Sequence, residues 1–114
     1  MKIESTETEK ALEQEIAVKA NKAPRVTLDD LNDNVVDVEI VKHVTRTGKI
    51  LRWAVITTKS GFSVTGKPSA SVCAENDNEE IGYNIAVANA RDELWALMGY
   101  ALAEKLSAES LLLD

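Results

Sequence analysis

The helical stretch 84–100 holds the polar residues whose types and spacing best suit ligand chemistry. At 100° per residue, Arg91 and Asn84 fall between two apolar shoulders, and Asp92 falls within the same apolar arc. A buried charge must be paired or bind a counter-charge. Two interpretations follow. In the first, Arg91 and Asp92 are structural and pair with backbone groups of the sheet turns or with a second subunit. In the second, Arg91 and Asn84 line a pocket and face the phosphate or base of a ligand.

The other reactive residue types form no catalytic pattern. Cys73 and His43 are the single cysteine and the single histidine, and neither belongs to a recognisable motif. The acidic pairs Asp29–Asp30 and Glu79–Glu80 stand at expected helix starts, where the helix dipole explains them. The chain has no glycine-rich phosphate loop. The sequence predicts a protein that is not an enzyme and has no metal and no cofactor.

Length and charge limit the possible partners. The 114 residues suffice for one domain, and the net charge of −6 disfavours duplex nucleic acid. The sequence has no apolar run of about 18 residues that would span a bilayer, and its amino terminus lacks the apolar core of a secretory signal. We therefore expect a cytoplasmic protein that does not bind membranes.

An N-terminal helix is expected to precede the main domain. Thr6 and Glu9 have the spacing of a capping box, and Pro24 ends the helical pattern. The apolar residues recur every fourth position, at Leu12, Ile16 and Ala20. We interpret residues 1–23 as a helical extension and residues 24–114 as a single domain.

The domain itself has the pattern of an α+β fold. Thr27 can cap a short helix, and alternating or β-branched runs predict strands near 36–44, 50–58 and 62–66, the second covered on both faces. Short turns connect them, so we expect a three-stranded antiparallel meander packed against C-terminal helices, with the extra N-terminal helix. The last helical region begins after Asp77 or Asn78 and is expected to break or kink at Gly99 and to end near residue 107.

Several segments together resemble a family of small tailed-phage proteins, the phage gene 49/gene 66 family. The resemblance covers about residues 25–106. The segments that carry it are Arg25–Leu31, Ser60–Gly66, Glu80–Gly82, Asn89–Trp95 and Leu97–Tyr100. The family usually has a lysine at the position of Glu93, a glutamate at that of Met98 and an acidic residue at that of Lys67.

The family is in turn similar to the phage Thoeris anti-defence sponges, small α+β proteins that assemble as dimers or larger oligomers. The resemblance implies a phage protein that binds and sequesters a cyclic nucleotide or cyclic-ADP-ribose-type immune signal in the host cytoplasm, without degrading it. The residues that would line such a pocket are Arg91, Asn84, Asn89, Phe62 and Trp95.

A second hypothesis needs no small ligand. The narrow apolar stripe of the N-terminal helix lies outside the family-like region, and the surface of residues 94–106 also carries apolar side chains. Either surface suits contact with another protein. On this hypothesis the chain is a phage accessory protein that acts through protein–protein interaction.

Overall fold

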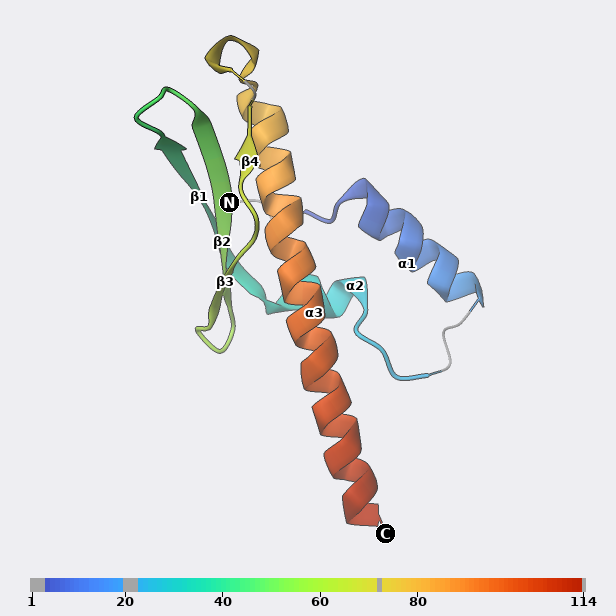
Figure 1. The fold of residues 1–114 in the computed structure, drawn as a ribbon. Helices are drawn as coiled ribbons and strands as arrows, with labels where there is room; N and C mark the ends of the chain where they lie inside the picture. The colour runs from blue at the N-terminus through green and yellow to red at the C-terminus, as the bar shows by residue number, and fades with distance from the viewer. Residues whose placement is uncertain (1–3, 20–22, 72, 114) are drawn as a thin grey trace.

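The computed structural model describes residues 4–19, 23–71 and 73–113. The elements follow one another as α1 (Glu7–Lys19), α2 (Leu28–Asn34), β1 (Val35–Val44), β2 (Ile50–Thr58), β3 (Ser63–Thr65), β4 (Ser69–Ala70), the 3₁₀ turn η1 (Ala74–Asn76) and α3 (Glu79–Leu113). The predicted α+β class is confirmed. An antiparallel sheet lies against one long C-terminal helix, with α1 and α2 on the helix side (Figure 1).

The three helices begin at side chains that accept hydrogen bonds from otherwise unpaired backbone N–H groups. Thr27 Oγ1 accepts from Asp30 N at 3.1 Å, and the Asp30 carboxylate accepts from Thr27 N, completing a capping box. This backbone N–H of Thr27 is the main cause of the lowered pKa of Asp30. At the start of α3, Asn78 Oδ1 accepts from Ile81 N at 3.0 Å. The caps expected at Thr27 and Asn78 are therefore confirmed.

The sheet is built around β2. Strands β1 and β2 pair antiparallel from Val44↔Ile50 to Val35↔Thr58, with a register irregularity between Val35 and Asp37. On the other edge β2 pairs with both β3 and β4. Strand β3 lies within the expected third strand at residues 62–66, and β4 is an additional strand that was not predicted. Pro68, which lacks a backbone N–H, lies in the gap between them.

Helix α3 is a single helix of 35 residues, about 52 Å long at 1.5 Å per residue. The expected break at Gly99 and the expected end near residue 107 are both wrong. The residues after Gly99 are good helix formers and mostly solvent-exposed, so no packed neighbour redirects the chain. The helix projects beyond the sheet, and Leu111 and Leu112 near its end are 73% and 85% exposed (Figure 1).

Small residues bring α3 close to the sheet. Its buried apolar residues are Ala86, Ala90 and Leu94, which join the buried side chains of the strands and α2 in one core. Ile81, Ile85 and Asp92 are exposed, so Asp92 does not lie among buried apolar neighbours as the helical-wheel prediction placed it. That prediction followed the largest apolar side chains. The face of α3 that packs on the sheet is instead the one with Ala86 and Ala90, because alanine permits closer approach of the backbones.

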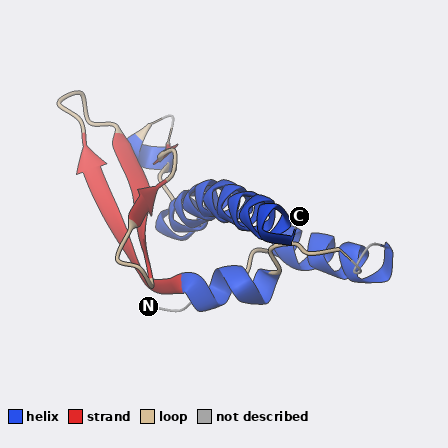
Figure 2. Cartoon of the chain, turned by 90° about the horizontal axis from the view of Figure 1, so that it is seen from below, coloured by secondary structure: helices blue, strands red, loops and turns tan. Residues whose placement is uncertain are grey.

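One face of β2 packs on α3, and the described helices leave the other face uncovered (Figure 2). Along β2 the buried residues, among them Ala54 and Ile56, alternate with half-buried ones such as Trp53 and Val55. The expectation that β2 is covered on both faces is therefore wrong. The run looks continuous in sequence because the outer face of this strand is also apolar.

Candidate functional site

Arg91 lies inside the protein, with only 2% of its side chain exposed. Its Nε–H donates to both carboxylate oxygens of Glu9, at 2.8 and 3.1 Å. Its Nη2 donates to Oδ1 of Asn32 at 2.7 Å. Arg91 is thus paired within the chain, as one interpretation held, but its partner is neither a sheet turn nor a second subunit. The partner is a carboxylate of the N-terminal helix.

The Glu9 carboxylate is surrounded by N–H donors and is only 9% exposed. Besides Arg91, the indole N–H of Trp95 donates to its Oε2, and the backbone N–H of Thr6 donates to its Oε1 at 2.8 Å. One carboxylate therefore receives charge-assisted hydrogen bonds from a guanidinium, an indole and a backbone amide. These groups form a site whose chemistry is to hold an oxyanion.

Three helices position this cluster. Arg91 and Trp95 are four residues apart on α3, so their side chains lie side by side on one face. Asn32 of α2 donates from Nδ2 to Ser5 Oγ at 2.9 Å, which turns its Oδ1 toward Arg91. Thr6 Oγ1 accepts from the backbone N–H of Glu9 at 3.0 Å. The expected capping box of α1 is confirmed, and its glutamate also serves as the partner of Arg91.

A second carboxylate attaches α1 one turn later. Glu13 pairs with Arg25, and its Oε2 accepts from Leu28 N at 2.6 Å. The hydrogen bond from this backbone N–H is the main reason that the pKa of Glu13 lies below its ordinary value, and Arg25 lowers it further. Two glutamates thus join α1 to the domain. Of the apolar stripe of the N-terminal helix, Leu12 is 54% exposed, Ile16 is half-buried and Ala20 lies outside the described residues.

Two cavities flank the Glu9–Arg91 pair, one on each side along α3. The first has a volume of about 550 Å³ and lies between residues 4–7 and α3, where Asn84 and Ala88 line it. The second, of about 260 Å³, lies between α1 and Trp95. The N-terminal segment thus runs beside a stripe of α3 that contains Asn84, Ala88, Arg91 and Trp95, and Asn84 remains exposed.

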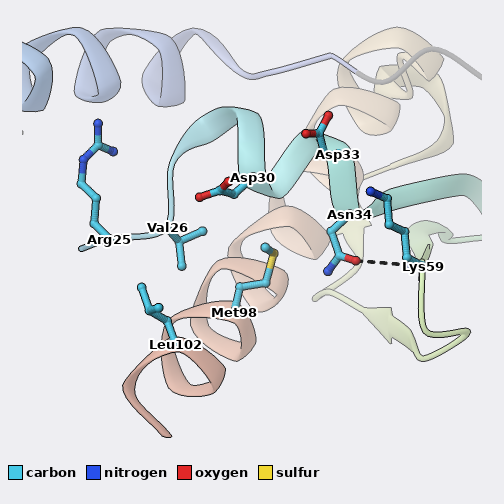
Figure 3. Close-up of a pocket in the computed structure, with 8 residues that line it drawn as sticks. All are labelled: Arg25, Val26, Asp30, Asp33, Asn34, Lys59, Met98 and Leu102. Atoms are coloured by element: carbon cyan, nitrogen blue, oxygen red, sulfur yellow. Dashed lines mark hydrogen bonds between the residues drawn. The ribbon is translucent and has the colours of Figure 1, made fainter. Parts of the chain in front are cut away.

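A third cavity of about 410 Å³ lies between α2 and α3 (Figure 3). Met98 and Leu102 line it from α3, while the cations Arg25 and Lys59 and the α2 carboxylates surround it. The backbone N–H of Lys59 donates to Asn34 Oδ1 at 3.3 Å, the bond drawn in Figure 3. Because the lining carries both signs of charge, this cavity does not single out an anionic or a cationic ligand.

The structure brings three of the five predicted ligand residues to one surface. Asn84, Arg91 and Trp95 share the stripe of α3 beside the N-terminal segment, with Asn84 exposed and Arg91 buried. Asn89 lies off this stripe and donates from Nδ2 to the Lys67 carbonyl at 2.8 Å, which ties the β3–β4 loop to the helix. Phe62 is 62% exposed in the turn before β3.

The family of the chain follows from comparison with known proteins. A model of the Phage protein (N4 Gp49/phage Sf6 gene 66) family matches residues 26–106. The chain belongs to this family. No curated protein and no solved structure matches it.

The boundary of the family match divides the Arg91 cluster. Asn32, Arg91 and Trp95 lie inside the matched residues of this phage protein, whereas Glu9 and Thr6 lie in the segment that precedes them. The two side-chain donors of the oxyanion site, Arg91 and Trp95, are therefore part of the phage family domain. The carboxylate that occupies the site comes from outside it.

A second buried cation of the phage protein has a structural role. Arg52 on β2 donates from Nη1 and Nη2 to the two carboxylate oxygens of Asp77, at 2.7 and 2.8 Å. The shared hydrogen bonds raise the pKa of Arg52 and lower that of Asp77. Ser69 Oγ donates nearby to the Gly82 carbonyl at 2.9 Å. These contacts fasten the loop before α3 to the sheet.

Sequence patterns point to neither carboxylate partner of the buried arginines. Glu9 and Asp77 have the spacing of capping residues. Such local spacing indicates a cap but does not identify a partner 82 or 25 residues away.

Among the described residues no group of three or more histidines, cysteines or carboxylates could hold a metal ion. None of the described helices combines the length and apolarity needed to cross a bilayer.

Proposed function

We propose that this phage protein binds and sequesters a cyclic nucleotide signal of host immunity, of the cyclic oligonucleotide or cyclic-ADP-ribose type, in the host cytoplasm. The observation that supports the proposal is the convergence of the Arg91 guanidinium and the Trp95 indole on one oxyanion. Such a ligand carries phosphates, for which a buried guanidinium is a suitable partner. The protein needs no nucleophile for this role, in accord with its resemblance to the anti-defence sponges.

On this proposal the α3 stripe is the centre of the ligand site. Arg91 binds a phosphate, Trp95 adds an N–H donor and an aromatic surface, and Asn84 offers an amide to a base or ribose. Asn89 and Phe62 lie on other surfaces, so they reach the same ligand when a second copy supplies them. The proposal therefore includes a dimer or a higher homo-oligomer, with the ligand near the junction of two copies.

Titration calorimetry with cyclic-ADP-ribose isomers and with cyclic di- and trinucleotides tests this function. We expect binding at micromolar concentration or tighter, and intact nucleotide on denaturing the complex, as shown by chromatography. The double variant Glu9→Gln/Arg91→Met removes the guanidinium without leaving an unpaired buried charge, and it should lose the binding. Arg46→Met, the same change at an exposed turn residue, should retain it. No heat with any of these nucleotides refutes the proposal.

The exposed surface of α3 supports a second candidate, a phage accessory protein that binds another protein. Large apolar side chains within residues 94–106 of α3 remain exposed. They are Leu97, Tyr100 and Leu106. Leu97 and Tyr100 are three residues apart and share one face of the helix, whereas Leu106 lies on the opposite face. An exposed apolar pair of this kind is typical of protein contact sites.

The two candidates predict opposite effects for the same variants. If the protein acts by protein contact alone, Leu97→Glu/Tyr100→Glu abolishes capture of its partner in a pull-down from infected cells, while Glu9→Gln/Arg91→Met does not. If it sequesters a nucleotide through α3, the double variant at Glu9 and Arg91 releases the infected host from inhibition of its defence.

A further inference from the structure

The groups of the Glu9–Arg91 cluster come from two parts of the chain, the region matched by the family model and the segment before it. The cation, the indole N–H and the orienting amide all belong to residues within the family match, and the anion belongs to the preceding segment. A family domain without that segment would leave the Arg91 guanidinium and the Trp95 indole N–H without this acceptor. Such donors need an anion from elsewhere, because a buried unpaired guanidinium is strongly unfavourable.

We infer that the Arg91–Trp95 site is an oxyanion-binding site of the family domain and that Glu9 occupies it as an internal substitute for the phosphate or carboxylate of an external ligand. Helix α1 is then a displaceable cover, and ligand binding replaces the Glu9 carboxylate by a group of the same charge and similar geometry. The inference rests on the proposed function for the natural ligand, but it makes its own claim about the site.

The geometry of the cluster fits an exchangeable anion. Arg91 keeps Nη2 bonded to Asn32, which fixes the plane of the guanidinium within the domain, and it presents Nε–H to the carboxylate. Trp95 presents its N–H to the same carboxylate. An oxyanion with two oxygens available, either a carboxylate or a phosphate, can accept both bonds without any change in these three side chains.

Helix α1 is attached in a way that permits its release. Along Glu7–Lys19 no apolar side chain is buried, so displacing the helix exposes little apolar surface of its own. Its described attachments to the domain are chiefly polar, through the carboxylates of Glu9 and Glu13 and the side chain of Ser5 before it. The main penalty for release is the charge left on Arg91, and an incoming anion removes that penalty.

The surroundings of Glu9 leave room for a ligand larger than a carboxylate. The cavities of about 550 and 260 Å³ lie on either side of the Glu9–Arg91 pair along α3. If α1 and residues 4–6 move away, the stripe from Asn84 to Trp95 becomes one surface, with Arg91 between its two halves. A phosphate at the position of the Glu9 carboxylate would place the rest of a nucleotide along this stripe.

Chemical rescue of Glu9→Ala tests the site without any nucleotide. Thermal unfolding is followed in sodium phosphate, acetate or chloride at equal ionic strength. Phosphate and acetate should raise the unfolding temperature of Glu9→Ala saturably above its value in chloride, and should do so much less for the wild type. Glu15→Ala, the same change at an exposed position of α1, is the matched control and should respond as the wild type does. Equal responses of the Glu9 and Glu15 variants overturn the inference.

The variant Glu9→Gln keeps the side-chain shape and gives an independent measurement should Glu9→Ala fail to fold. The indole N–H resonance of Trp95, assigned with Trp53→Phe, should shift saturably on phosphate titration of Glu9→Gln and remain in place for Glu15→Gln. Absence of a phosphate-dependent shift in Glu9→Gln overturns the inference. Loss of the shift in Glu9→Gln/Arg91→Met confirms Arg91 as the binding group.

Nucleotide titration separates failure of this inference from failure of the proposed function. When a cover must be displaced, the apparent Kd equals the intrinsic Kd divided by the fraction of molecules in which the cover is open. Glu9→Gln should increase that fraction and therefore bind the cyclic nucleotide about tenfold more tightly than the wild type. Equal affinities support sequestration at a site that Glu9 does not cover, and they overturn the inference. Phosphate rescue without any cyclic nucleotide binding supports the oxyanion site and refutes the sponge proposal.

Discussion

Replacing Gly66 by alanine should destabilise the protein strongly, although the change adds only one methyl group. Gly66 follows β3 and lies against the backbone of α3. A Cβ at this position would lie 2.3 Å from both Ala90 N and Asn89 C, and 2.6 Å from Asn89 O. The backbone at Gly66 does not adopt a positive φ, so lack of space rather than backbone strain forbids the side chain.

The magnitude follows from that lack of space. The new methyl group falls about 1 Å short of ordinary van der Waals contact, and its neighbours are hydrogen-bonded helix backbone that cannot rotate away. Overpacking of this kind costs about 1–3 kcal/mol. Moving the loop away from α3 also breaks the bond from Asn89 to the Lys67 carbonyl, worth about 1 kcal/mol. The stiffer unfolded chain returns about 0.5 kcal/mol, which leaves a net loss of about 1.5–3.5 kcal/mol, centred on about 2.5 kcal/mol.

Urea denaturation followed by tryptophan fluorescence and far-UV circular dichroism measures the loss. With a slope of about 1.5 kcal/mol per molar urea, the unfolding midpoint of Gly66→Ala should fall by about 2 M. Gly99→Ala is the matched control, because none of the described atoms lies within 4 Å of a Cβ at that helical position. It should raise helix stability by up to about 1 kcal/mol. A Gly66→Ala protein within about 0.5 kcal/mol of wild type would refute the close contact between this loop and α3.

Three further predictions concern caps and carboxylates. Thr27→Ala removes the cap of α2 and should lower the free energy of unfolding by about 1 kcal/mol, measured by urea denaturation. The pKa of Glu13 is lowered in the folded state, chiefly by the Leu28 N–H, so Glu13 stabilises docked α1 above about pH 4.5. That contribution is lost as the pH falls through the folded pKa, and limited proteolysis should then cleave the N-terminal segment faster. Asp77→Ala leaves buried Arg52 without its carboxylate and should lower the thermal unfolding temperature markedly.

Each of these predictions has a control at an exposed position. Ser107→Ala on the projecting part of α3 should leave the free energy of unfolding unchanged within about 0.5 kcal/mol. Glu13→Gln should remove the acid-dependent increase in proteolysis, while Glu15→Gln should keep it. Asp92→Ala should not lower the unfolding temperature. An effect of Asp92→Ala equal to that of Asp77→Ala would contradict the role assigned to the Arg52–Asp77 pair.

Local patterns suffice for most of the fold. The capping boxes at Thr6 and Thr27 predict two helix starts, because a cap is formed by residues only three positions apart. The turn around Gly61, which adopts a φ of 86°, is predicted from its sequence for the same reason. Strand alternation predicts β1 correctly, since one face of that strand is solvated.

Features that depend on distant partners cannot be predicted in this way. Arg91 is recognisable as an unusual residue in its helix. Its partner Glu9 is not, because that residue is 82 positions away in sequence and reaches Arg91 only through the packing of α1. Strand β4 cannot be predicted in this way, because its two residues form a strand only through pairing with the distant β2. A helical wheel does not identify the alanine-lined face of α3 as the buried face, because alanine is only weakly hydrophobic.

The projection of α3 beyond the sheet gives this helix a gradient of hydrogen-exchange protection along its length. Backbone amides near Ala90 lie in the core, and their exchange should require opening of the whole domain. Residues 103–112 are exposed, and an isolated segment of that length is marginally helical in water. Their amides should therefore exchange orders of magnitude faster in a single copy. Slow exchange there would identify this segment, rather than the sheet, as the surface that another molecule covers.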